Sequence, residues 1–188
     1  MSALATSAVP HDDHQLAAAW AAGDPQAGDA FLRRYFPILW RFFRHKTQRD
    51  VADLVQRTLL SAVRHVDRLA QARHVRAYVL ATARHELYAA LRRERGAAFD
   101  PYETSIIAEG TSPSRAAGRT QRREQLRLAM LRLPIILAEA LELHYFEGLC
   151  GRELAEALDI PEPTARGRLH RARRQLAELL GEDLDAWL

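Results

Sequence analysis

Apolar residues recur every three or four positions along most of the chain, which is the spacing of amphipathic helices. Pro37 lies inside one of these periodic segments and is expected to kink or split its helix. The pattern predicts an all-α fold, with helices over residues 15–22, 27–46, 50–69, 75–95, 121–133, 135–146, 152–158 and 163–180.

The periodicity stops between residues 96 and 118, where Gly, Pro, Ser, Thr and acidic residues replace the apolar stripe. We interpret this segment as a flexible acidic linker. It joins two small helical domains, over residues 12–95 and 119–182. Residues 1–11 are small and polar and are expected to be disordered, and residues 183–188 form a C-terminal tail.

Composition narrows the class of protein. The 188 residues carry a formal charge of +3, and a hydrophobic content of 48% is too high for a disordered chain. No apolar run approaches the roughly 20 residues of a membrane span, and the N-terminus lacks a secretory pattern. We therefore expect a cytoplasmic protein without membrane insertion. The single cysteine, Cys150, excludes an internal disulfide and is either a packing residue or a thiol sensor.

Positive charge is carried almost entirely by arginine. Lys46 is the only lysine, so the other 26 basic residues are arginines. This bias reflects either a GC-rich genome or a demand for planar contacts with phosphates and bases, and composition alone leaves both interpretations open.

The most specific pattern lies near the C-terminal end. A short helix ending at Leu158, a three-residue turn over 159–161 and a longer basic helix are typical of a helix-turn-helix. The apolar stripe of the second helix runs from Ala165 to Leu176, and the opposite face is either a solvated basic surface or a surface that binds duplex DNA. The candidate residues on that face are Thr164, Arg166, Gly167, His170 and Arg171, which would reach base edges and adjoining phosphates, and Arg173 and Arg174, which would neutralise phosphates.

Two helices of the first domain carry further candidate surfaces. One has an exposed stripe that is either a protein contact or plain solvent surface: Asp50, Asp53, Gln56, Arg57 and Leu60. The other interleaves aromatic residues with cations, as suits a single nucleic-acid strand: Tyr78, Arg84, His85, Tyr88, Arg92 and Arg93. The alternative for this second helix is a set of core tyrosines and a basic end that complements the helix dipole.

Together these segments resemble the sigma-70 family of bacterial sigma factors, in its extracytoplasmic-function (ECF) group. Residues 50–66 (DVADLVQRTLLSAVRHV) resemble the polymerase-binding helix, and residues 75–96 (VRAYVLATARHELYAALRRERG) the promoter-melting helix. Residues 131–176 resemble the domain that binds the −35 element. The resemblance implies a region 2-like and a region 4-like domain, and it covers nearly everything from Asp12 to Leu180.

The resemblance implies a sigma factor that binds core RNA polymerase and directs promoter-specific initiation. Asp53 and Gln56 match residues that bind the β′ clamp helices, and contact with the β subunit is implied as well. The loop over 70–75, with Arg73 and His74, would capture a flipped base of the −10 element. The acidic linker would thread toward the active-site cleft and the RNA exit path. Promoter DNA and an anti-sigma factor are the further candidate partners.

The chain departs from the family pattern at several positions. Tyr78, His85 and Ala89 stand where the melting helix usually has Trp, Asn and Asp. Residues 135–138 (IILA) replace a polar run of the −35 domain. This replacement either removes a backbone phosphate contact or creates an apolar surface for a partner.

Other chemistry finds no support in the sequence. His85-Glu86 begins a zinc-protease pattern, but Ala89 stands at the second ligand position. No catalytic residue, metal site or cofactor is expected. The remaining alternative is a two-domain helix-turn-helix regulator without a polymerase contact. Asp53, Gln56 and the acidic linker favour the sigma factor, because a plain regulator needs none of them.

Overall fold

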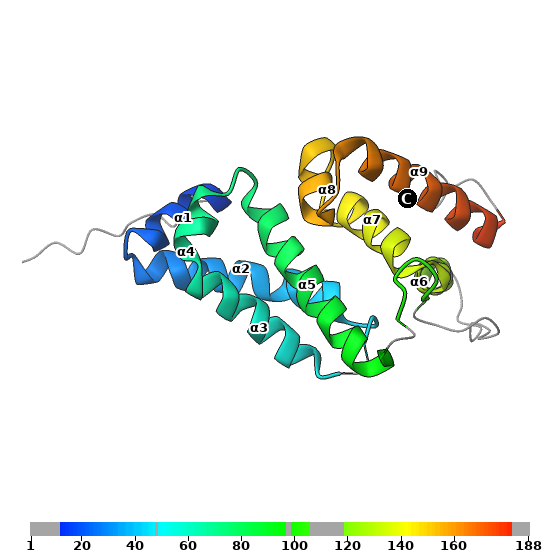
Figure 1. Ribbon diagram of the computed structural model, residues 1–188, viewed down its shortest axis with the longest axis horizontal. Coiled ribbons are helices and arrows are strands. Elements are labelled where there is room, and N and C mark those ends of the chain that lie inside the picture. The colour runs from blue at the N-terminus through cyan, green and yellow to red at the C-terminus, as the bar shows by residue number, and fades with distance from the viewer. Residues whose placement is uncertain (1–11, 48, 97–98, 106–118, 182–188) are drawn as a thin grey trace, which may run out of the picture.

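A computed structural model describes residues 12–47, 49–96, 99–105 and 119–181 (Figure 1). The all-α prediction is confirmed. The expected disorder of residues 1–11, the expected tail and most of the predicted linker lie outside the described residues. Within them the helices are α1 (Asp13–Ala21), α2 (Pro25–Phe43), α3 (Val51–Arg64), α4 (Val66–Gln71), α5 (Val75–Arg95), α6 (Arg119–Arg132), α7 (Ile135–Tyr145), α8 (Gly151–Leu158) and α9 (Glu162–Leu180).

Aspartate side chains begin three of the helices. Asp12, Asp24 and Asp50 each accept a hydrogen bond from the backbone N–H two residues later, at 3.3, 2.8 and 2.8 Å. These bonds satisfy N–H groups that have no partner inside the helix. Pro25 follows Asp24 in the first turn of α2, where the missing N–H of proline is harmless. Local sequence therefore sets the starts of α1, α2 and α3.

Two helices differ from the sequence prediction. Pro37 was predicted to kink or split its helix, and α2 is not split, because it continues through Pro37. Pro37 and Arg33 are both exposed, so water can hydrate the Arg33 carbonyl that loses its partner. The predicted helix over 50–69 is instead divided into α3 and α4 at His65, whose backbone is not helical (φ −123°, ψ 35°). The Nδ1 atom of His65 lies 2.9 Å from the Ser61 carbonyl oxygen, which links the ring to the end of α3.

The first half of the chain, α1 to α5, packs around the aromatic face of α2. α1 contacts α2 and α4, and α3 contacts α2 and α5. Phe31 and Tyr35 are fully buried and stacked, with ring centroids 4.4 Å apart. The Tyr35 hydroxyl donates to Asp13 Oδ2 at 2.7 Å, which ties α2 to α1. The result is a helical core from which α3 and α5 present their outer faces.

The second half packs α7 and α8 against α9, with α6 beside α9 (Figure 1). Residues 99–105 of the predicted linker lie against the start of α7. The Ile135 N–H donates to the Thr104 carbonyl oxygen at 2.9 Å, and Ser105 forms an isolated bridge with Pro134. This part of the linker is therefore attached to the second half. The two halves meet where α5 contacts α8.

None of the helices in the described part of the chain has the length and apolar character needed to cross a membrane.

Candidate nucleic-acid and protein interfaces

The helix-turn-helix is formed by α8 and α9. α8 ends at Leu158 and is followed by Asp159, whose backbone is left-handed (φ 54°, ψ 50°). The next N–H, of Ile160, donates to the Ala155 carbonyl oxygen at 3.1 Å. Residues 159–161 then turn the chain into α9, with Pro163 in its first turn. This is the short connection that lets the second helix of such a motif enter the major groove.

The outer face of α9, which we call the recognition face, is open to solvent. Arg166 Nη2 lies 3.1 Å from Glu162 Oε1, so its ion pair stays within the first turns of α9. A Cβ atom built at Gly167 would meet no atom within 4 Å, so the fold does not require glycine there. All seven residues predicted for this face are exposed: Thr164, Arg166, Gly167, His170, Arg171, Arg173 and Arg174.

The stripe predicted on α3 is also accessible. Asp53 forms an ion pair with Arg57 at 2.9 Å on the same face, while Asp50 has the additional role of capping the helix. Leu60 and Val63 are 42% and 44% exposed, which places apolar surface beside these charges. The apolar period of this helix predicts a buried Val63, and that prediction is wrong. Asp53 is half-exposed, and the other predicted members are exposed: Asp50, Gln56, Arg57 and Leu60.

The residues predicted for a single DNA strand are divided between surface and interior. Those that are exposed are Arg73, His85, Arg92 and Arg93. Those that are half-buried or buried are His74, Tyr78, Arg84 and Tyr88. The structure therefore brings them to one helix and the loop before it, but the second half of the chain covers part of the set.

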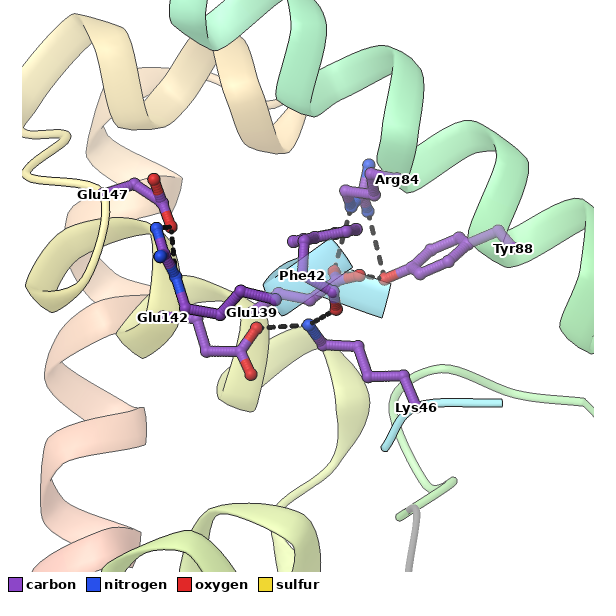
Figure 2. Close-up of polar contacts among 8 residues, drawn as sticks. Phe42, Lys46, Arg84, Tyr88, Glu139, Glu142 and Glu147 are labelled. Carbon is purple, nitrogen blue, oxygen red and sulfur yellow. Dashed lines mark hydrogen bonds and ion pairs between the residues drawn. The ribbon is translucent and has the colours of Figure 1, made fainter. Parts of the chain in front are cut away.

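The deepest contact across the two halves is made by Glu139 of α7, whose side chain is fully buried. Its Oε2 atom accepts from Arg84 Nε at 3.1 Å and from the Tyr88 hydroxyl at 2.8 Å (Figure 2). Burial raises the pKa of the Glu139 carboxyl, although Arg84 and Lys46 act in the opposite direction. Burial and the nearby carboxylate also raise the pKa of Tyr88. The cluster therefore holds a carboxyl group that is strongly desolvated.

A second contact involves Lys46, the only lysine in the sequence. Its residue is 2% exposed, and its ammonium donates to Glu142 of α7 and to the Phe42 carbonyl oxygen (Figure 2). The same nitrogen lies 3.9 Å from the centroid of the Phe42 ring. Because Lys46 follows α2, this contact ties the first half to α7.

Further contacts extend along the junction. Arg41 Nη2 donates to Glu147 Oε1 at 2.5 Å, and Arg76 Nη1 donates to the Glu147 carbonyl oxygen at 3.0 Å. Where α5 begins, His74 Nδ1 lies 2.8 Å from Glu156 Oε2. The junction, which we call the interdomain interface, is thus lined by charged pairs that join α2 and α5 to α7, α8 and the loop between them.

Sequence reasoning missed the buried charged residues Glu139 and Arg168. Arg168 lies three residues after Ala165 and four before Ala172, so its place on the buried stripe of α9 was readable from the spacing. Glu139 directly follows the apolar residues 135–138, so its position in the sequence also indicated burial. Glu139 Oε1 and Arg168 Nη1 are buried without a hydrogen-bond partner among the described residues. Burial lowers the pKa of Arg168.

Cys150 is exposed just before α8, so the interpretation of it as a packing residue is wrong.

Comparisons with known proteins agree with this arrangement. A family model described as Sigma-70 region 2 matches residues 30–97, and one described as Sigma-70, region 4 matches residues 123–176. Two relatives are named ECF RNA polymerase sigma factor SigM, from Mycobacterium tuberculosis strains H37Rv and Erdman. The first is 30% identical over 172 residues, covering 90% of this chain and 85% of the relative. The second is 30% identical over 170 residues, covering 89% and 84%.

Two solved structures share the fold. One is CnrH in complex with the cytosolic domain of CnrY, with a TM-score of 0.65 and 24% identity, covering 90% of this chain and 97% of that one. The other is the sigma factor RpoE in complex with the anti-sigma factor NepR from Bartonella quintana. Its TM-score is 0.60 at 23% identity, with 81% of this chain and 96% of that one covered.

Proposed function

The chain belongs to the ECF RNA polymerase sigma factors of the sigma-70 family, and from this premise we propose how its surfaces divide the work of promoter recognition. As a sigma factor it directs promoter-specific transcription with RNA polymerase. In our proposal the domain over residues 119–182 reads the −35 duplex. The domain over 12–95 binds core polymerase and captures the −10 strand, and the acidic linker over 96–118 connects them.

The observation that carries this proposal is the recognition face of α9. Five arginines and a histidine of the segment from Glu162 to Arg174 follow a three-residue turn, and all but Arg168 lie on the exposed side. An arginine near the N-terminal end of such a helix can pair with guanine, an interaction that discriminates between bases by ~1–3 kcal/mol. Arginines further along the helix contact phosphates and supply affinity that depends on salt.

The −10 strand is assigned to α5 and the loop before it. Tyr78 and Tyr88 provide aromatic faces on which bases can stack, and a stacked base contributes ~1–3 kcal/mol. The exposed cations at both ends of this surface, Arg73 and Arg92 among them, would hold the phosphates. Single-stranded DNA would therefore run along α5 from the loop over 70–75 toward residue 95.

Core polymerase is assigned to α3. Its exposed face combines an ion pair, an amide and apolar side chains, which is the mixture expected of a protein interface rather than of a solvated helix. The β′ clamp helices are the proposed partner of Asp53 and Gln56, and the β subunit is a second contact. The protein would thus act in the cytoplasm as a specificity subunit, with no catalytic chemistry of its own.

An anti-sigma factor is a further proposed partner. One solved structure that shares the fold is itself a complex with an anti-sigma factor. Such a protein would compete with core polymerase or DNA for the exposed surfaces of α3, α5 and α9.

Reconstituted transcription tests the proposal directly. Core polymerase with the purified protein should initiate RNA synthesis at discrete positions on fragments of the source genome, and core polymerase alone should not. Duplex binding without initiation would instead indicate a helix-turn-helix regulator that lacks the polymerase contact.

A further inference from the structure

Part of the surface assigned to the −10 strand, around Arg84 and Tyr88, is covered by the second half of the same chain. The Arg84 side chain is 11% exposed and Tyr88 is 7% exposed. Glu139 of α7 binds both of them, and the Tyr88 ring also packs edge-on against Phe99. A DNA strand cannot stack on a buried tyrosine or pair with a buried guanidinium. Capture of the −10 strand therefore requires the two halves of the molecule to separate.

The ion pairs that cross the interdomain interface all have the same arrangement of charge. In the described part of the chain, each acid belongs to the second half and each cation or histidine to the first half: Arg84 with Glu139, Lys46 with Glu142, Arg41 with Glu147, His74 with Glu153 and Glu156, and His85 with Asp159. A DNA strand offers negatively charged oxygens of the same kind. The second half thus occupies polar groups on α5 that a strand would use.

The same arrangement leaves duplex recognition open. All seven residues of the recognition face on α9 are exposed while Arg84 and Tyr88 are buried. The second half therefore covers part of the surface assigned to the −10 strand and leaves the recognition face uncovered.

The interdomain interface is also incompletely paired. Glu139 Oε1 and Arg168 Nη1 are buried without a hydrogen-bond partner in the residues that the structure describes. A buried polar atom without a partner destabilises the state that buries it. Removing the Glu139 and Arg84 charges from water is a further cost, so this interface is less strongly held than an apolar core.

We propose that this arrangement is an autoinhibited state of the free protein, in which acids of α7, α8 and the adjoining loops cover the part of the −10 surface around Arg84 and Tyr88 until the two halves separate. The inference rests on the proposed function of α5. It couples opening to binding, because a ligand that binds only the open form has its affinity reduced by the fraction of open molecules.

A covalent bridge across the interface tests the inference. Arg41→Cys and Glu147→Cys, in a Cys150→Ser background, place two thiols at positions whose side chains now touch. Neither residue belongs to a proposed DNA-binding surface. One sample is bridged with a short bis-maleimide, and its matched control is the same variant with both thiols capped by N-ethylmaleimide. Bridging should lower initiation with core polymerase by about tenfold or more relative to the capped control, and leave duplex binding unchanged.

The outcomes separate the two proposals. Equal initiation by the bridged and capped samples would overturn autoinhibition while leaving the sigma function intact. Absence of initiation from the capped variant and from the unaltered protein would contradict the proposed function itself.

A second set of variants tests the interface without a bridge. Glu139→Ala removes the acceptor used by Arg84 and Tyr88 and should therefore favour separation of the two halves. The radius of gyration of this variant, measured by small-angle X-ray scattering, should be larger than that of the unaltered protein. Glu139→Gln keeps an acceptor oxygen for Tyr88 and should stay closed. Asp29→Ala is the matched control, because Asp29 is exposed and pairs with Arg33 inside α2. Thermal melting and duplex binding confirm folding, and equal radii for Glu139→Ala and the control would overturn the inference.

Discussion

Residues on the recognition face of α9 differ in what they would contribute to DNA binding. Arg166 lies in the second turn and Arg173 two turns later. Residues near the start of a recognition helix reach base edges, whereas later ones meet phosphates. The face thus contains residues that select a sequence and residues that only hold the duplex.

Arg166→Ala should relax sequence preference, because a bidentate contact with a base contributes ~1–3 kcal/mol of discrimination. Arg173→Ala should weaken binding to all duplex sequences by a similar factor. It should also reduce the magnitude of the slope of log affinity against log salt concentration by about one unit. Binding to a set of duplexes at several salt concentrations measures both effects. The same behaviour in both variants would mean that α9 faces the DNA differently.

Gly167 offers a second residue-level test. Gly167→Ala should stabilise the free protein by ~0.5–1 kcal/mol, because glycine is a poor helix former and a Cβ there meets no atom within 4 Å. It should also weaken duplex binding if the backbone approaches the DNA closely. Thermal melting and anisotropy measure the two effects.

Gly28→Ala is the matched contrast for Gly167→Ala. A Cβ at Gly28 would lie 2.6 Å from Trp20 Nε1, so this change should destabilise the fold by ~1–3 kcal/mol. Loss of stability at Gly167 as well would contradict the open space around that position.

At the scale of single elements, α3 keeps an exposed outer face that combines charged, amide and apolar side chains. Gln56→Ala with Leu60→Ala should change unfolding free energy by less than ~1 kcal/mol, because both side chains are exposed. Affinity for core polymerase should fall by about tenfold or more, since apolar side chains at the centre of an interface contribute most of its binding energy. Anisotropy with labelled protein measures the affinity.

The control for this α3 variant is Gln26→Ala, an exposed amide in the first turn of α2. It should bind core polymerase like the unaltered protein. An unchanged affinity in the α3 double variant would remove α3 from the polymerase interface.

Elements were the scale at which the sequence was most informative. The period of three and four predicted α5 with its observed bounds, and the turn over 159–161 placed α9 correctly. The break at His65 was missed because the apolar period continues across it, so no change in pattern marked the non-helical backbone. The burial of Arg168 was missed because a charged side chain adds no apolar residue to the stripe that identifies the buried face.

For the whole molecule, the sequence carried little information about the interdomain interface. In the sequence, nothing distinguishes the acids of this interface from other acids of helices and loops. Their partners come from the other half of the molecule, in the pairs Glu139 with Arg84, Glu142 with Lys46 and Glu147 with Arg41. Such contacts join positions tens of residues apart. Periodicity describes which face of a helix is buried, but it does not identify the partner of that face.

Acidity should shift the molecule toward the closed form. Burial raises the pKa of Glu139, which faces Arg84, Tyr88, Lys46 and Arg168, so the closed form binds more protons than an open form with an ordinary carboxyl pKa. Closed molecules are therefore stabilised below the raised pKa and lose that stabilisation as pH rises through it.

Small-angle scattering between about pH 8 and pH 5 tests this linkage: the radius of gyration should fall with pH. The dependence should be weaker in Glu139→Gln, which has no proton to bind at that position. A radius that rises as pH falls, or an unchanged dependence in Glu139→Gln, would contradict the expected sign of the linkage.

The single lysine has a practical consequence for studying this equilibrium. Lys46 carries the only side-chain amine in the sequence, and its side chain is 1% exposed where it meets Glu142. Reagents that acylate amines need the nitrogen unprotonated and accessible. Acylation of Lys46 should therefore require α7 to move away, just as the exchange of a protected amide hydrogen requires local opening. The rate of acylation of Lys46, followed by mass spectrometry, thus reports how often the unaltered protein opens, without any engineered label.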